Sequence, residues 1–266
     1  MLADPLLTQP MDVDPAKLLV VSGYTPNISS FATMAYENHR EYCASGGYQY
    51  RCYQSGFYEG RAPSWSKVLF LLKALAEKDQ QGRNAWHWVF WMDIDAIFTN
   101  FTTPLESRLA GLASEQEMVL GEDIWGVNTG LWFVKNTAWS HECLTAVWHG
   151  DPLPFLLSGL KPPVWIDQDR YMAEQTTLWH HLALRDELAK IKLLPYYELG
   201  GYLEEYDNDT CVPREQAFRP PTINAPLPRQ GWRRADFALH LAGVSNEQRV
   251  SLLARILQDP HAIVRS

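Results

Sequence analysis

The sequence predicts one α/β domain in which helices cover both faces of a mostly parallel sheet. The chain has 266 residues, 46% of them hydrophobic, which suits a single domain with a sizeable core. Short apolar runs alternate with segments of helical periodicity, an order typical of parallel strands joined by helices. Residues 88–92 are continuously apolar, as expected of a strand buried on both faces. Residues 1–16, with three prolines and three aspartates, are expected to form a loose leader to a domain over 17–266.

The first half of the domain is expected to alternate between strands and helices. Ser29 or Ser30 is the expected N-cap of the first helix, and Ser64 that of the second, because serine side chains accept hydrogen bonds from free helical N–H groups. The expected elements, in order, are a strand over 17–21, a helix from 29 or 30 to about 45–47, a strand over 48–53, a helix that begins after residue 64, and a strand over 88–92.

The second half is expected to add two strands and three helices. The strands are predicted over 118–120 and 131–134, and the helices around 138–149, 170–184 and 246–258. The proline-rich residues 212–232 predict an extended surface loop. No internal repeat and no linker divides the chain.

Charge and cysteine content exclude several classes of protein. The formal net charge is -8, which argues against a nucleic-acid partner and favours either a neutral or cationic ligand or an anion held through a metal. The four cysteines form no C-x-x-C pair, so neither a disulfide scaffold nor a zinc site is expected. Whether Cys43 and Cys52 pair is left open by their spacing. No apolar run is long enough to cross a bilayer.

The clearest chemical signal is a pair of carboxylates at the end of the most apolar strand. Asp93 and Asp95 follow residues 88–92 directly. Ligands of open α/β sheets bind beyond the carboxyl ends of strands, and extended residues two apart point the same way. Two carboxylates beside a buried strand are costly unless they are paired or bind a cation. The pair therefore predicts a site for Mn²⁺ or Mg²⁺ that would hold substrate phosphates, in preference to a solvated strand end.

Three further segments carry polar groups with weaker signals. Asn128, Thr129 and Gly130 are hydrogen-bonding and close-approach residues, or else an ordinary turn between strands. Asp167 and Asp169, ahead of Glu174 and Gln175, are explained better by the preference of acids for a helix N-terminus than by a role in binding. His240, within an apolar segment, is by itself more typical of a core histidine.

The order of these motifs resembles the family 34 glycosyltransferases, which include fungal α-galactosyltransferases, yeast α-1,6-mannosyltransferase subunits and plant xyloglucan α-xylosyltransferases. The resemblance covers roughly residues 17–245. It rests on W-S-K-V, W-V-F-W-M-D-I-D-A-I-F-T-N, G-V-N-T-G-L-W-F-V-K-N-T-A-W-S, E-Q-T-T-L and H-L-A-G, in that order along the chain.

The resemblance implies a GT-A, Rossmann-like nucleotide-sugar transferase fold and a role for each matching residue. Glu174 and Gln175 match the acidic-Gln pair near the reacting carbon, where the family often has Asp. The implied metal ligands are Asp93, Asp95 and His240, which reverses the core-histidine interpretation. The implied nucleotide-sugar contacts are Ser22, Gly23, Tyr24, Trp65, Lys67, Asp93, Asn128, Thr129 and Gly130.

The implied function is a retaining transfer of a hexose or pentose from a UDP- or GDP-sugar to a glycan hydroxyl, which forms an α-glycosidic bond with Mn²⁺ or Mg²⁺ as cofactor. The resemblance also implies a Golgi lumen or membrane location, with a cytoplasmic or soluble location as the alternative. Assembly with copies of itself or with related transferases is a further expectation.

Two other functions stay open at this point: a metal-dependent hydrolase of nucleotide sugars, and a non-catalytic sugar-binding subunit of a transferase complex. A glycoside hydrolase is disfavoured, because it needs two carboxyls on opposite sides of a glycosidic bond.

Overall fold

The computed structural model confirms the predicted α/β architecture. It describes residues 13–123, 126–150, 174–202, 232, 235–259 and 263–265. Six strands form the main sheet in the order β2-β1-β3-β6-β5-β7, and β4 pairs with β8 in a second, two-stranded sheet. The strands are β1 (Leu18–Gly23), β2 (Gln49–Tyr53), β3 (Trp88–Met92), β4 (Ala96–Phe98), β5 (Met118–Asp123), β6 (Gly126–Lys135), β7 (Ile191–Leu194) and β8 (Ala238–His240).

The main sheet is mostly parallel, with one reversed strand. Neighbours β1 and β2, β1 and β3, and β5 and β7 are parallel, whereas β6 is antiparallel to both β3 and β5. Both β5 and β6 are longer than predicted and reach the edge of the sheet where β3 ends. The reversal brings the first residues of β6 to the carboxyl ends of β1 and β3.

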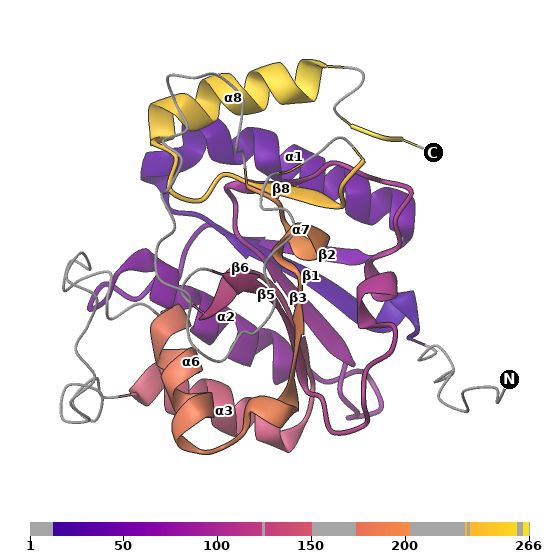
Figure 1. The fold of residues 1–266 in the computed structure, drawn as a ribbon, viewed down its shortest axis with the longest axis vertical. Helices are drawn as coiled ribbons and strands as arrows, with labels where there is room; N and C mark the ends of the chain where they lie inside the picture. The colour runs from indigo at the N-terminus through magenta and orange to yellow at the C-terminus, as the bar shows by residue number, and fades with distance from the viewer. Residues whose placement is uncertain are drawn as a thin grey trace, which may run out of the picture.

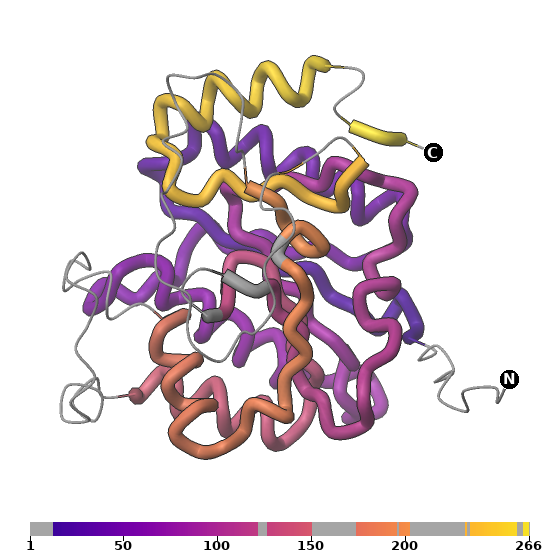
Figure 2. Tube along the Cα trace, in the orientation of Figure 1, coloured from indigo at the N-terminus to yellow at the C-terminus, as the bar shows by residue number. Residues whose placement is uncertain are grey.

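Helices cover both faces of the sheet, as Figure 1 shows. On one face lie α2, α3 and α6, while α1 and α8 pack together on the other. In Figure 2 the yellow C-terminal segment returns alongside the indigo-to-purple N-terminal helix. The helices are α1 (Ser29–Gly46), α2 (Ser66–Leu75), α3 (Ala138–His149), α6 (Glu174–Leu184), the short α7 (Tyr196–Leu199) and α8 (Asn246–Gln258).

The predicted serine caps of the first two helices are wrong. Each helix follows a proline-led 3-10 turn, over Pro26–Ile28 and Pro63–Trp65, and neither has a side-chain cap. Because each 3-10 turn leads directly into the α-helix, no serine side chain caps the first turn. The predicted glycine end of α1 is confirmed, because Gly47 takes the left-handed conformation at φ 74°.

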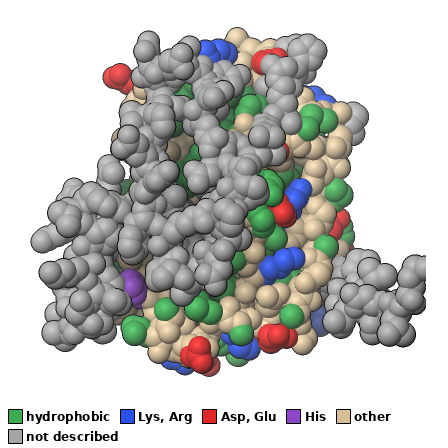
Figure 3. All heavy atoms as spheres, in the orientation of Figure 1, with side chains coloured by type: hydrophobic (Ala, Val, Ile, Leu, Met, Phe, Trp, Pro, Cys, Tyr) green, Lys and Arg blue, Asp and Glu red, His purple; other side chains and the backbone are tan. Residues whose placement is uncertain are grey.

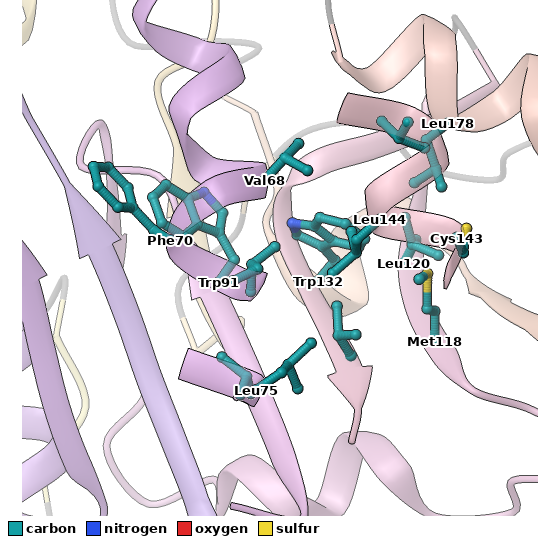
Figure 4. Packing of buried hydrophobic residues seen from close by; sticks show 14 of the residues in the cluster. Val68, Phe70, Leu75, Trp91, Met118, Leu120, Trp132, Cys143, Leu144 and Leu178 are labelled. Atoms are coloured by element: carbon teal, nitrogen blue, oxygen red, sulfur yellow. The ribbon is translucent and has the colours of Figure 1, made fainter. Parts of the chain in front are cut away.

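Alternate residues of the buried strands β3 and β6 pack into two hydrophobic cores, one on each face of the sheet. Trp91 and Trp132 face α2, α3 and α6, and Figure 4 shows their indoles beside Val68, Leu144 and Leu178. The residues between them in each strand pack on the opposite face with α1 and the loops above it. Burial on both faces explains why residues 88–92 are continuously apolar.

Several predicted features lie outside the described residues: the leader over 1–12, Asp167, Asp169, the start of the helix predicted from 170, and all of the 212–232 loop except Trp232. Cys43, Cys52 and Cys143 are free thiols, so Cys43 and Cys52 do not pair. On the face seen in Figure 3, acidic and basic side chains are interspersed among the coloured residues.

Candidate active site

The candidate site lies at the edge of the sheet where β1 and β3 end and β6 begins. Parallel pairing sets Val21 of β1 opposite Trp91 of β3, so β1 and β3 end at the same edge of the sheet. Antiparallel pairing sets Met92 opposite Leu131, which brings residues 128–130 to the same edge. The Asp93 N–H then donates to the Gly130 carbonyl at 2.7 Å. Three sequence segments singled out for chemistry thus meet at one place.

His240 reaches this edge from the far end of the chain. β4 and β8 are antiparallel, with Ala96 opposite His240, so the imidazole lies beside Asp95. Its Nε2 is 3.4 Å from Asp95 Oδ1. Asp93, Asp95 and His240 each offer a ligand atom, and these atoms lie within 4.8 Å of one another. The expected meeting of the three side chains is confirmed, and their role as ligands stays a prediction.

Gly130 is required by the position of the His240 ring. A Cβ atom at residue 130 would lie 2.2 Å from His240 Cε1, closer than two carbon atoms can approach. The backbone N–H of His240 donates to the Gly201 carbonyl at 2.9 Å, and the imidazole stacks on the Tyr202 ring. The glycine of the N-T-G motif therefore makes room for the histidine.

Lys67 joins Asp93 to the neighbouring acid of α6. Its side chain is 4% exposed, and its Nζ lies 2.9 Å from Asp93 Oδ1 and 3.0 Å from Glu174 Oε1. The same ammonium donates to the Thr129 carbonyl at 3.1 Å. One buried cation thus compensates two carboxylates that come from different elements.

Glu174 and Gln175 open α6 directly against β6. Thr129 Oγ1 donates to Glu174 Oε1 at 3.0 Å, and the Thr129 N–H donates to Gln175 Oε1 at 3.1 Å. The other oxygen of Glu174, Oε2, is buried and has no hydrogen-bond partner in the described part of the chain. Glu174 is therefore joined to Asp93 through Lys67, and the role of the acidic-Gln pair near a reacting carbon stays a prediction.

The three best-paired groups have pKa values shifted toward their charged forms. Burial alone would raise the pKa of Glu174, but Lys67 outweighs it and lowers that pKa. Burial would likewise lower the pKa of Lys67, and the charges of Asp93 and Glu174 raise it instead. For Asp95, His240 and Arg249 overcome the effect of burial and hold the pKa well below its usual range. At Asp93 burial dominates, and the nearby charge of Asp95 adds to it, so the pKa is raised.

The residues expected on the nucleotide side differ in exposure and in their contacts. Ser22 is fully buried, and its hydroxyl is 3.0 Å from His39 Nδ1, so that side chain is already engaged inside the fold. Gly23 and Tyr24 are partly exposed. Trp65 is buried, with the Arg61 guanidinium 4.4 Å from its ring centre.

Two contacts at the carboxylates were not predicted from the sequence. Trp91 Nε1 donates to Asp93 Oδ1 at 2.6 Å, a contact that the same-side geometry of residues two apart in a strand could have revealed. Arg249 of α8 lies 2.6 Å from Asp95 Oδ2. No local pattern marks that arginine, because its position depends on how the last helix crosses the fold.

The cluster of Asp93, Asp95 and His240 could hold a divalent cation. Two carboxylates provide the hard oxygen ligands that Mg²⁺ and Mn²⁺ prefer, and an imidazole adds one nitrogen. His240 Nδ1 is buried without a hydrogen-bond partner in the described residues, which leaves a nitrogen of the ring available.

No described helix combines the length and the apolar character needed to cross a membrane.

Part of the chain resembles known glycosyltransferases in sequence. The model of the galactosyl transferase GMA12/MNN10 family matches residues 18–112. Xyloglucan 6-xylosyltransferase 4 of Arabidopsis thaliana is 24% identical over 143 residues, 49% of this chain and 27% of that protein. Probable glycosyltransferase 5 of Oryza sativa subsp. indica is 29% identical over 152 residues, 52% of this chain and 33% of that protein. The alignments thus span a third or less of these relatives' lengths.

Two solved structures share the fold along nearly their whole length. A glycosyltransferase involved in the glycosylation of the major capsid of PBCV-1 has a TM-score of 0.61 at 19% identity, with 90% of this chain and 98% of that chain covered. The galactosyltransferase LgtC, in complex with donor and acceptor sugar analogs, has a TM-score of 0.50 at 11% identity, with 89% and 95% covered. The chain therefore has the GT-A fold, and its resemblance to glycosyltransferase family 34 is confirmed over residues 18–112.

Proposed function

We propose that this protein is a retaining, metal-dependent glycosyltransferase that moves a hexose or pentose from a UDP- or GDP-sugar to a hydroxyl of a glycan acceptor, forming an α-glycosidic bond. One observation carries the proposal. A possible cation site, made by Asp93, Asp95 and His240, lies directly beside a buried network of Lys67, Thr129, Glu174 and Gln175. A leaving diphosphate and a reacting sugar need these two environments side by side.

The donor set fits Mn²⁺ or Mg²⁺, held by Asp93, Asp95 and His240. When bound, the ion neutralises the negative charge that develops on the diphosphate as the sugar departs. Lys67 adds a fixed positive charge between Asp93 and Glu174.

Glu174 and Gln175 are proposed to face the sugar carbon that gains positive charge. Lys67 keeps Glu174 ionised and in place, and Thr129 orients both side chains through its hydroxyl and its N–H. An ionised oxygen fixed in this way strengthens its interaction as the carbon becomes positive, so it favours the transition state over the bound donor. The acceptor hydroxyl would lose its proton to the departing diphosphate, so no dedicated base is required.

The nucleotide is proposed to lie against residues 22–24, with Trp65 and Lys67 next to it along the chain. The Ser22 hydroxyl is bound to His39 and the Tyr24 N–H donates to the Tyr53 carbonyl, so the partly exposed surfaces of Gly23 and Tyr24 are the groups proposed to contact the nucleotide. Asn128 and Gly130 would form the wall of the sugar site. The names of the plant relatives support a sugar donor, and by resemblance the Golgi lumen is the proposed compartment.

A panel of UDP- and GDP-sugars tests the proposal. Nucleotide release is measured with Mn²⁺, with and without oligosaccharide acceptors, and the linkage of the product is read by NMR. A transferase releases nucleotide faster with an acceptor and gives an α-linked product. Equal release without an acceptor, with free sugar formed, would instead show a nucleotide-sugar hydrolase. Nucleotide binding without turnover of any sugar would indicate a non-catalytic subunit.

A further inference from the structure

The guanidinium of Arg249 makes several polar contacts at the edge of the candidate cation site. It lies in the first turns of α8, whose N-terminus is closed by a capping box of Ser245 and Gln248. Its Nη2 is 2.6 Å from Asp95 Oδ2, and its Nε and Nη2 each lie 3.3 Å from the Leu241 carbonyl. Its Nη1 donates to Asn246 Oδ1 at 3.1 Å. The side chain is 17% exposed, so these contacts are largely shielded from water.

These contacts close a ring between Asp95 and the segment that carries His240. The Leu241 N–H donates to the Asp95 carbonyl at 2.9 Å, while the Leu241 carbonyl accepts from Arg249, which in turn binds the Asp95 carboxylate. Both the main chain and the side chain of Asp95 are therefore tied to the residue next to His240. Rotation of the carboxylate would break one contact of the ring.

We propose that Arg249 is a positioning residue that holds Asp95 Oδ2 and so presents Asp95 Oδ1 toward His240, where the cation binds. This inference rests on the metal dependence proposed above. A carboxylate that ligates a cation is itself usually hydrogen-bonded, and loss of such outer partners typically weakens metal binding about 10- to 100-fold. The planar fork of arginine suits the task, because it binds the carboxylate and the Leu241 carbonyl at once.

The alternative is that Arg249 has only a structural role and stabilises the packing of α8 against the rest of the fold. Its guanidinium is 5.3 Å from the centre of the Phe31 ring on α1, so it also contributes to that packing. A fastening role predicts lower stability with an unchanged cation site. A positioning role predicts that substitution of Arg249 weakens cation binding, and that this loss of affinity requires the Asp95 carboxylate.

The test measures binding of Mn²⁺ alone to the full chain, without donor, by loss of the free-ion signal in electron paramagnetic resonance. Arg249→Met is expected to raise the dissociation constant about 10- to 100-fold. Arg249→Lys keeps the charge and loses the fork, so we expect an intermediate rise. Arg40→Met is the matched control, since Arg40 pairs with Glu37 on the exposed side of α1, and it is expected to leave the constant unchanged. Thermal unfolding without metal establishes that each variant is folded.

A double-mutant cycle with Asp95→Asn separates positioning from fastening. If Arg249 acts through Asp95, Arg249→Met adds little further loss of Mn²⁺ affinity in the Asp95→Asn background. Full additivity, or wild-type affinity in folded Arg249→Met and Arg249→Lys, would overturn the inference and leave the proposed function standing. Absence of Mn²⁺ binding to the wild-type chain would overturn both.

Discussion

Asp93 and Asp95 stand two residues apart at the end of one strand, yet their surroundings differ. Asp93 lies between Lys67 and the indole of Trp91, next to Glu174, and its pKa is raised by burial and by the charge of Asp95. Asp95 lies between His240 and Arg249, which hold its pKa low. Asp93 is thus held by Lys67 of α2, whereas Asp95 is held by His240 of β8 and Arg249 of α8.

The difference shows that a D-x-D pair is not two copies of one ligand. The two acids lie in the turn that follows β3, where the Ala96 N–H donates to the Asp93 carbonyl at 3.0 Å, and not in the extended conformation expected from the sequence. Both carboxylates lie at the cation site, but each joins that site to a different part of the molecule. Asp93 connects it to the proposed sugar pocket through Lys67. Asp95 connects it to β8 and α8. Changes on the two sides should therefore have separable effects.

The largest effect is expected from removal of either carboxylate charge. Asp93→Asn and Asp95→Asn should each lower the rate of nucleotide release about a thousandfold or more, because the cation that neutralises the leaving group is no longer held. The measurement is the initial rate at saturating donor and Mn²⁺. Near-normal turnover in either variant would remove that residue from the proposed ligand set.

The next largest effect is expected at Lys67, the buried partner of Asp93. Lys67→Met leaves Asp93 and Glu174 without their shared cation, so we expect a loss of about 3–5 kcal/mol in the free energy of unfolding in urea at pH 7. Lys73→Met, an exposed position on the same helix, should change it by less than about 0.5 kcal/mol. Adding Glu174→Gln to Lys67→Met should restore part of the loss. Equal stability of the two lysine variants would contradict the role given to Lys67.

Glu174→Gln tests whether the carboxylate that Lys67 joins to Asp93 faces the reacting sugar. The variant keeps the shape of the side chain and removes its charge, so kcat should fall about 10²–10³-fold while the donor KM changes less. Glu115→Gln, at an exposed acid, is the control. A kcat within about threefold of wild type would mean that Glu174 is a structural partner of Lys67 and that another carboxylate faces the sugar.

Gly130→Ala acts on the Asp95 side without touching a carboxylate. The new methyl group would lie 2.2 Å from His240 Cε1, so the ring must move. We expect Mn²⁺ affinity to fall about 10- to 100-fold, the range typical of a disturbed ligand. Isothermal titration calorimetry with Mn²⁺ measures it. Wild-type affinity in this variant would show that His240 is not a ligand.

The smallest effect is expected behind the site, at His39. Its ring bonds Ser22 at the end of β1 and the Ala96 carbonyl beside Asp95, and burial lowers its pKa to about 4. A histidine of ordinary pKa in the unfolded chain, about 6.5, takes up a proton first as the pH falls, so protonation favours unfolding. Stability from this group is full above pH 6.5, and about 2 kcal/mol of it should be lost between pH 7 and pH 5.

Urea unfolding of wild type and His39→Gln across that range isolates the His39 contribution. Glutamine is uncharged at both pH values, so the variant should show a correspondingly smaller loss of stability on acidification. An identical pH dependence in the two proteins would assign the acid sensitivity to other groups.

Local patterns predicted most of the fold, because each pattern lies within a few residues. The apolar run predicted β3 at its observed bounds, and periodicity predicted α3 and α8 at theirs. The expected serine caps of α1 and α2 were wrong, since a proline-led turn precedes each helix. The strands β5 and β6 were predicted too short, because their ends carry the polar residues of the site.

The site was less predictable, because its contacts join distant segments. The adjacent carboxylates were evident from the strand that precedes them. His240 by itself indicated a core residue, and only the family resemblance pointed to the cation site. The second partner of Lys67 and the contact of Arg249 with Asp95 depend on how helices far apart in sequence pack, and nothing in the local sequence encodes that.

The pairing of β4 with β8 also has a consequence for biosynthesis. One partner of this small sheet follows Asp95 directly, while the other ends at His240, close to the C-terminal helix. A nascent chain can assemble β1, β2 and β3 early, but the three candidate ligands cannot meet until β8 has been synthesised and has docked. Such long-range pairing is slow to form. Cation binding would therefore report that the whole chain, and not only its N-terminal half, has reached the native topology.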